Sequence, residues 1–178
     1  AERNSSVPSS TVQGITKDAA AGTTSCASED FQTIPANATS YTTQTWTNGQ
    51  ITWTATDART DQTLNATRAI TIRNGSLTST AVSNGIADLT VTTQLTFSGS
   101  AGTFKLNVNG IEVGSIPYST AITTTTIPGI NVTGNVVISI TGNSSTSNRV
   151  KFDDLSWTCA PSLGVNQLDG KSFTIYPN

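Results

Sequence analysis

Two adjacent carboxylates interrupt a regular apolar pattern near the C-terminal end of the chain. In RVKFDDLSWTC (residues 149–159) the alternation of large apolar residues slips by one position between Phe152 and Leu155, and Asp153 and Asp154 occupy the slip. A β-bulge inserts one extra residue into a strand and changes the direction in which its side chains point. The pattern therefore predicts a bulged strand that turns one of the two carboxylates inward.

The two cysteines bracket most of the sequence that is typical of strands. Cys26 and Cys159 are too far apart in the sequence for a redox motif, and their placement favours a disulfide formed in an oxidising compartment. Two buried free thiols are the alternative. If the cysteines are bonded and their strands run antiparallel, counting inward from them places Glu29 opposite Ser156.

This strand pairing brings four acidic side chains together: Glu29, Asp30, Asp153 and Asp154. Carboxylates packed in a partly desolvated corner repel one another unless a cation lies between them. A ligand set of carboxylate oxygens, without histidine or thiolate, is typical of Ca²⁺. We therefore predict a structural Ca²⁺ ion at these residues. The alternative is a solvated acidic turn beside an edge strand.

A second group of charged residues lies in one short stretch. Arg59, Arg68 and Arg73 accompany Asp57 and Asp61 there. A guanidinium group binds carboxylate or sulfate through two parallel hydrogen bonds, so these arginines are suited to an anionic polysaccharide. Arg68 and Arg73 do not share a face in a regular strand, so Arg59 and Arg73 are the pair expected to reach a common groove, from opposite ends of the loop. The alternative is that the arginines only neutralise the two aspartates.

Aromatic side chains are the other candidates for a sugar site, because the apolar faces of pyranose rings stack on exposed aromatic rings. The candidates are Tyr41, Trp46, Trp53 and Tyr118. Trp46 and Trp53 share one face of a predicted hairpin, and that face is either the ligand face or the core face. Trp157 is in phase with its apolar neighbours and is expected in the core. The loops YSTAITTTT (118–126) and GNSSTSNR (142–149) are the next places to search.

The composition argues against catalysis and against nucleic acid as a partner. The chain has no histidine, so the Ser-His-Asp and Cys-His arrangements are absent. The best carboxylate pair for a glycosidase is Asp57 with Asp61, and its polar setting is typical of a turn. The formal net charge of −2 disfavours non-specific binding to nucleic acid or an anionic membrane. No apolar run is long enough for a membrane span.

Short strands separated by turns account for the middle of the chain. Asn48-Gly49 and Asn109-Gly110 each predict a tight hairpin, and we expect Val108 to oppose Ile111 and Leu106 to oppose Val113. No long window has a helical period. About ten strands must bury their apolar faces in two packed sheets, which predicts an all-β, two-sheet sandwich of the jelly-roll type. The expected organisation is a Ser/Thr/Ala-rich linker (1–25), the sandwich (26–159) and a C-terminal segment (160–178).

Parts of the chain resemble known families. SEDF before the first strand and VKFDDLSW in the last resemble the paired ends of calcium-containing jelly-roll carbohydrate-binding modules, in which an early acid and a late aspartate share a structural ion. FTIYPN at the end is similar to the start of the sorting domain of the type IX secretion system of Bacteroidota. The middle of the chain also resembles accessory modules of secreted hydrolases and nucleases in that phylum. These resemblances imply a protein secreted or held at the cell surface, covalently linked to a catalytic domain upstream.

The resulting hypothesis is a non-catalytic carbohydrate-binding module that holds a secreted enzyme on its polysaccharide. A nucleic-acid-targeting domain of a secreted nuclease is one alternative, which the arginines allow and the acidic pI disfavours. A structural or adhesive surface module is another.

Overall fold

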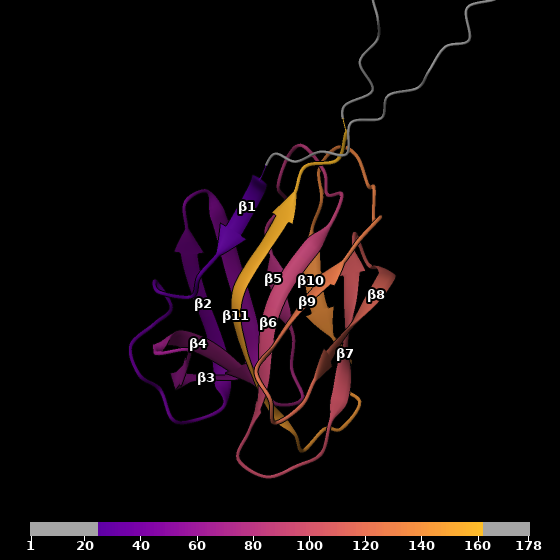
Figure 1. The fold of residues 1–178 in the computed structure, drawn as a ribbon. Coiled ribbons are helices and arrows are strands. Elements are labelled where there is room, and N and C mark those ends of the chain that lie inside the picture. Colours follow the sequence, from indigo (N-terminus) through magenta and orange to yellow (C-terminus); the bar gives the residue numbers. More distant parts are fainter. Residues whose placement is uncertain (1–24, 162–178) are drawn as a thin grey trace, which may run out of the picture.

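The computed structural model describes residues 25–161, and there the chain is an antiparallel β-sandwich (Figure 1). The all-β, jelly-roll type of fold predicted from the sequence is confirmed. Eleven strands make up this described part of the chain. They are β1 (Ser25–Glu29), β2 (Thr42–Asn48), β3 (Ile51–Leu64), β4 (Thr67–Ile72), β5 (Leu77–Ser79), β6 (Leu89–Thr96), β7 (Gly102–Val108), β8 (Ile111–Tyr118), β9 (Thr123–Ile127), β10 (Ile138–Thr141) and β11 (Arg149–Thr158).

The long strand β3 belongs to both layers of the sandwich. Its first half pairs with β2 and β5, and its second half pairs with β4. Asp57 lies where the partners change, with a φ of 46°, a conformation that aspartate adopts more readily than most other non-glycine residues. The strand path β8-β7-β10-β5-β3-β4-β11-β6-β9 therefore folds over itself at β3, with β1 added on β11 and β2 on β3 (Figure 1).

Aromatic side chains fill the space between the layers. The Trp53 and Trp157 rings meet edge to face with centroids 6.3 Å apart, and Phe104 contacts Phe152 in the same way at 5.1 Å. All four side chains are buried, which confirms that Trp157 belongs to the core. Edge-to-face pairs add about 0.5–1.5 kcal/mol to the free energy that comes from burying the rings. These rings therefore fix how the two layers pack.

The two predicted hairpins are present, with local differences in register. The turn between β7 and β8 is Asn109-Gly110, both with positive φ, and Val108 opposes Ile111 as predicted. Leu106 faces Gly114 and not Val113, because the register of β7 and β8 shifts by one residue there. The turn between β2 and β3 is centred on residues 49–50, one position later than predicted, because Asn48 still pairs with Ile51.

The disulfide between Cys26 and Cys159 is confirmed, and their Cα atoms are 4.8 Å apart. It joins β1 to β11, which run antiparallel as predicted. The predicted register is wrong by one residue, because an irregularity at Cys26 leaves Glu29 opposite Leu155 and not opposite Ser156.

The segments that flank the sandwich lie almost wholly outside the described residues. These are the predicted linker (1–25) and the C-terminal segment (160–178), which includes the FTIYPN sequence. Ser25, the last residue of the predicted linker, already belongs to β1. Within residues 25–161 there is no helix long and apolar enough to cross a bilayer.

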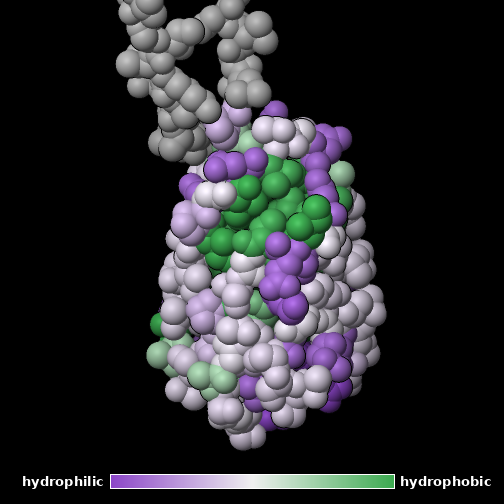
Figure 2. Space-filling view, turned by 90° about the vertical axis from the view of Figure 1, so that its right-hand side faces the viewer, coloured by the Kyte–Doolittle hydropathy of each residue, from purple (hydrophilic) through white to green (hydrophobic). Residues whose placement is uncertain are grey.

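An apolar patch is visible on the face that carries β8 and β9, toward the end of the sandwich that holds residues 25 and 161 (Figure 2). Ile111, at the start of β8, is the most exposed large apolar side chain of the described chain, at 70%. Val113, Ile130 and Val132 are partly buried against the core. This end of the molecule is therefore closed by aliphatic side chains.

Candidate functional site

Glu29 is a buried carboxylate held by two donors. Its Oε1 accepts a hydrogen bond from the backbone N–H of Phe31 at 2.6 Å, and its Oε2 accepts one from Nε1–H of Trp46 at 3.1 Å. The side chain has no exposed surface. Burial raises the pKa of the Glu29 carboxyl, although both hydrogen bonds act in the opposite direction. Glu29 therefore anchors the end of β1 to β2 through buried hydrogen bonds.

Asp153 is the second buried carboxylate, and it lies in the predicted bulge. The register of β11 against β6 shifts after Asp153, and Asp154 has a φ of 48°, so the bulge is confirmed. Asp153 points inward and Asp154 is exposed. Oδ1 of Asp153 accepts a hydrogen bond from the backbone N–H of Asp154 at 2.9 Å, and its Oδ2 lies 2.7 Å from Oγ1 of Thr67. Burial raises the pKa of the Asp153 carboxyl.

The described structure does not gather the four predicted calcium ligands into one group. Within residues 25–161, no three side chains of the types Asp, Glu, His and Cys gather as a group that could hold a metal ion. Each oxygen of Glu29 and Asp153 takes part in one hydrogen bond within the protein, and Asp30 accepts one from the backbone N–H of Gln32. The shift at Cys26 removes the strand register that was expected to bring the four carboxylates together.

The two buried carboxyls are expected to respond oppositely to amide substitution. Oγ1 of Thr67 has one proton and lies 2.7 Å from both the Leu64 carbonyl and Oδ2 of Asp153, so it can donate to only one of these two acceptors. A protonated Asp153, or an asparagine there, can donate to the same Oγ1, so we expect Asp153→Asn to be at least as stable as the parent at pH 7. Both oxygens of Glu29 accept hydrogen bonds from N–H donors. Glu29→Gln places an amide N–H opposite one of these donors and should lower the free energy of unfolding by about 1–3 kcal/mol.

The sign of the pH dependence follows from the raised pKa of Asp153. A carboxyl whose pKa is higher in the folded state than in the unfolded state stabilises the fold at pH values below its unfolded-state pKa. This stabilisation is lost as the pH rises through the folded-state pKa. Denaturant unfolding of the parent and Asp153→Asn between pH 4 and pH 8 is the measurement. The parent should lose more stability with rising pH than the variant, and parallel curves would contradict this assignment.

Three of the predicted sugar-binding aromatic residues lie in the core. Trp46, Trp53 and Tyr118 are each less than 9% exposed. The hairpin face that carries both tryptophans is therefore the inward face. Tyr118 donates from its hydroxyl to Oδ1 of Asn143 at 2.5 Å and accepts from Nδ2 of Asn148 at 3.1 Å. None of these rings offers a surface to a ligand in this structure.

Arg68 holds a loop and does not reach a groove. Its Nη1 donates to the carbonyl of Ile34 at 2.7 Å, and its Nη2 donates to the carbonyl of Pro35 at 2.6 Å. A third, longer bond reaches the carbonyl of Gln32 at 3.3 Å. The guanidinium thus neutralises no carboxylate and fixes the segment between β1 and β2.

The other two arginines join a row of alternating arginine and aromatic side chains. Cζ of Arg73 lies 4.5 Å from the Tyr41 ring centroid, and Cζ of Arg59 lies 5.6 Å from it. Arg59 also lies 5.2 Å from the Phe97 centroid, and Arg149 lies 5.0 Å from it. We call Tyr41, Arg59, Arg73, Phe97 and Arg149 the arginine-aromatic row. Each cation over a ring face contributes about 0.5–2 kcal/mol, depending on its exposure.

Two of these arginines are also paired with aspartates. Arg73 donates from Nε and Nη2 to the Asp57 carboxylate at 3.0 and 2.7 Å, and Arg59 makes the same two-bond contact with Asp61. The hydrogen bonds from Arg73 and Arg59 lower the pKa of the Asp57 and Asp61 carboxyls. Arg59 and Arg73 therefore neutralise the two aspartates, whereas Arg68 does not, and Arg73 remains 44% exposed at the surface.

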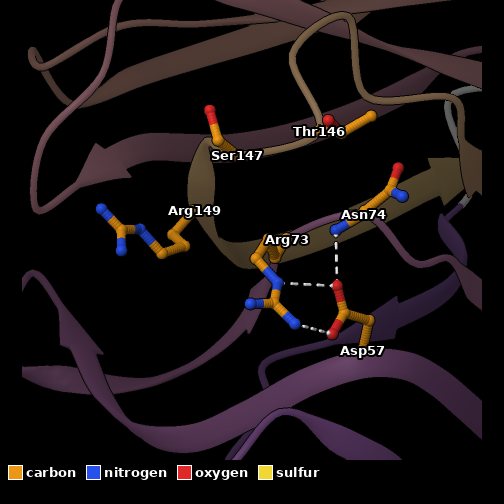
Figure 3. Close-up of a pocket in the computed structure, with 6 residues that line it drawn as sticks. All are labelled: Asp57, Arg73, Asn74, Thr146, Ser147 and Arg149. Atoms are coloured by element: carbon orange, nitrogen blue, oxygen red, sulfur yellow. Dashed lines mark hydrogen bonds and ion pairs between the residues drawn. The ribbon is translucent and has the colours of Figure 1, made fainter.

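An open depression lies at one end of this row (Figure 3). It has a volume of about 430 Å³ and is lined by Asp57, Arg73, Asn74, Thr146, Ser147 and Arg149. That volume falls in the range of about 300–1,000 Å³ that is usual for small-ligand sites. Arg149 begins β11 and Cys159 follows its end, so the depression lies about 30 Å from the disulfide at 3.3 Å per residue.

Two members of the row were missed by sequence reasoning. Phe97 continues the inward alternation of β6 and looks like a core residue, but its φ of 62° turns it outward and it is 54% exposed. No local signal identifies this change of direction. Arg149 could have been found from the sequence, because it ends the polar loop GNSSTSNR. The same loop supplies Thr146 and Ser147 to the depression.

Comparisons with known proteins found likeness only at the level of structure. No protein-family model matches the sequence, and no curated protein matches it. A family 36 carbohydrate-binding domain of a multidomain xylanase from the hindgut metagenome of Trinervitermes trinervoides is similar, with 18% identity, a TM-score of 0.48, and coverage of 70% of this chain and 94% of that one.

Two further solved structures are similar to the same degree. One is a family 36 carbohydrate-binding module in complex with calcium and xylotriose, with 12% identity, a TM-score of 0.48, and coverage of 70% of this chain and 100% of that one. The other is a family 22 xylan-binding domain from Paenibacillus barcinonensis, with 10% identity, a TM-score of 0.47, and coverage of 78% and 96%. These similarities concern the fold alone and not the ligand.

Proposed function

We propose that this chain is a non-catalytic carbohydrate-binding module that holds a secreted enzyme on a polysaccharide with acidic groups. The observation that carries the proposal is the arginine-aromatic row beside an open depression lined with hydroxyl, amide and guanidinium groups. Such groups bind the hydroxyls and acidic substituents of a sugar chain through direct and charge-assisted hydrogen bonds. The proposal needs no Ca²⁺ ion. A catalytic domain upstream and export through the type IX secretion system are part of the proposal.

The main alternative is a module that targets nucleic acid. The row supplies arginines for phosphate contacts, but two of the three are already paired with aspartates. The whole chain carries a formal net charge of −2, which opposes accumulation on a polyanion as dense as a nucleic acid duplex. We therefore favour a glycan with more widely spaced charges. A structural or adhesive module would show no glycan binding.

Electrophoresis of the 178-residue protein through gels that contain one polysaccharide each is the direct test. Retention by acidic glycans that weakens between 50 and 500 mM salt supports the proposal, because screening weakens contacts between exposed charges. Retention by double-stranded DNA in preference to every glycan would favour the targeting of nucleic acid. Unchanged mobility in all gels would overturn the proposal.

Arg73→Ala is expected to weaken binding to an acidic polysaccharide by about 10-fold, the usual effect of losing one charge-assisted contact. Lys105→Ala is the matched control, since Lys105 is a similarly exposed cation paired with Glu112 at 2.8 Å on another part of the surface. The melting temperature of both variants should stay near that of the parent. Equal binding by Arg73→Ala and the parent would move the site away from the depression.

Arg59→Ala is expected to weaken the fold as well as binding. Its side chain is only 16% exposed and lies between the rings of Tyr41 and Phe97, so its loss removes two ring contacts and leaves Asp61 unpaired. Of the two arginines expected from the sequence to reach a common groove, Arg73 is therefore the cleaner test of ligand binding.

A further inference from the structure

The charges of the arginine-aromatic row do not cancel. Arg59 pairs with Asp61 and Arg73 pairs with Asp57, which leaves Arg149. Within residues 25–161, Arg149 has no carboxylate within salt-bridge distance, and its Nη2 donates only to the hydroxyl of Ser98 at 3.1 Å and, more weakly, to the Ser98 carbonyl at 3.4 Å. The row therefore carries one positive charge in excess, and that charge lies at Arg149.

The donors of Arg149 are also incompletely used. Its Nε is buried and has no hydrogen-bond partner among the described residues. Most buried polar atoms in folded proteins have a partner, so this donor lacks the hydrogen bond that such an atom usually makes. Arg73 uses only Nε and Nη2 on Asp57. The Nη1 groups of Arg73 and Arg149 make no hydrogen bond within the described residues.

The other side of the depression accepts hydrogen bonds. Oδ2 of Asp57 accepts from Nε of Arg73 and from the backbone N–H of Asn74, whereas Oδ1 accepts only from Nη2 of Arg73. A carboxylate oxygen has two lone pairs, so Oδ1 retains the capacity to accept a hydroxyl proton. Thr146 and Ser147 line the same depression with hydroxyl groups. A ligand that fits these donors and acceptors carries both an acidic group and hydroxyl groups.

We infer that the depression binds one monoanionic sugar residue, with its acidic group at Arg149 and its hydroxyl groups toward Asp57 and the Thr146–Ser147 loop. The inference rests on the proposed function and names the ligand class of the same site. The charges of Arg73, Asp57 and Arg149 sum to one positive charge, which a single carboxylate or sulfate ester neutralises. A dianion brings a second negative charge next to Asp57 and is disfavoured. Arg149 is thus the residue that discriminates acidic from neutral chains.

The test uses paired polysaccharides that differ in charge. Polygalacturonate is compared with its methyl ester, and dextran sulfate is compared with dextran, by isothermal titration at 50 mM salt. The parent should bind at least one acidic polymer at least about 10-fold more tightly than its neutral partner. Preference for polygalacturonate alone assigns the anion as a carboxylate, and preference for dextran sulfate alone assigns it as a sulfate ester. Equal affinity within both pairs would overturn the inference.

Arg149→Gln is compared with Lys105→Gln, which removes the same charge from a residue outside the depression. Arg149→Gln should lose the preference for the acidic polymer, while Lys105→Gln should keep it within about twofold. Melting curves and circular dichroism show whether Arg149→Gln is folded. Arg149→Lys is a second variant, which keeps the positive charge and should therefore retain part of the preference for the acidic polymer. An unchanged preference in a folded Arg149→Gln would refute the role of this residue.

Failure of this inference can be told apart from failure of the proposed function. If the parent binds neutral dextran or another neutral glycan and Arg149→Gln binds it equally, the module binds carbohydrate but its ligand is not an acidic sugar at Arg149. If the parent binds no glycan of either charge, both the function and the ligand class are wrong.

Discussion

Replacing Trp53 with alanine is expected to lower the free energy of unfolding by about 3–5 kcal/mol, the usual cost of removing a large aromatic side chain from a packed core. Trp53 has no exposed surface, it is paired across the hairpin with Trp46, and its ring contacts Trp157 edge to face. The substitution would leave a cavity between the two layers. The surrounding strands are held in place by their backbone hydrogen bonds and cannot move fully into this cavity. Chemical denaturation monitored by circular dichroism measures the loss.

Trp53→Phe is the control for this substitution. Phenylalanine keeps most of the ring contacts and removes Nε1–H, which is buried without a partner among the described residues. It should therefore cost much less than alanine. At temperatures where Trp53→Ala is still folded, its glycan binding should match that of the parent, because the ring does not reach the surface. Lost binding with unchanged stability would instead restore the interpretation of Trp53 as a ligand residue.

Removing the Cys26–Cys159 disulfide by a double alanine substitution is expected to cost about 4–5 kcal/mol. The cysteines are separated by 133 positions, and closing so long a loop in the unfolded chain removes a large conformational entropy. The variant should unfold at lower guanidinium concentration than the oxidised parent. The parent unfolded in the presence of a reductant is the matched control and should behave like the variant. Equal midpoints for all three samples would show that the unfolded chain gains little freedom when the bond is absent.

The features that sequence reasoning predicted correctly are those with a local or pairwise signal. The Asn109-Gly110 turn, the bulge at Asp153 and the disulfide each follow from one short pattern or one pair of residues. The fold class follows from alternating apolar residues in many short segments without a helical period. Such patterns determine which residues share a face, and Trp46 and Trp53 do share one. They do not determine whether that face points to the core, because tryptophan suits both settings.

Within residues 25–161 the four predicted calcium ligands do not gather as one group, and a single irregular residue that changes a strand register accounts for this. Counting inward from the cysteines assumed a regular ladder, but the irregularity at Cys26 moves every later partner by one position. A shift of one residue also reverses the face on which a side chain lies. Glu29 consequently points into the core toward Trp46 and accepts a hydrogen bond from its ring N–H.

The arginine-aromatic row could not be assembled from the sequence, because its members come from five separate parts of the chain. Tyr41 precedes β2, Arg59 lies in β3, Arg73 follows β4, Phe97 follows β6 and Arg149 begins β11. Only the strand order, in which β4 and β6 both pair with β11, brings the last three to one end of the sheet. The composition shows the charges but not which of them stays unpaired.

The disulfide also determines how the domain would respond to tension. Cys26 lies at the start of the sandwich and Cys159 just after its last strand, with their Cα atoms 4.8 Å apart. A pulling force applied to the chain on both sides of the domain would pass through this covalent bond and would not load the hydrogen-bonded ladders between the two cysteines. The sandwich would then keep its shape under a load that unzips a domain without such a bond, and the depression at the far end of β11 would keep its geometry while the chain is stretched.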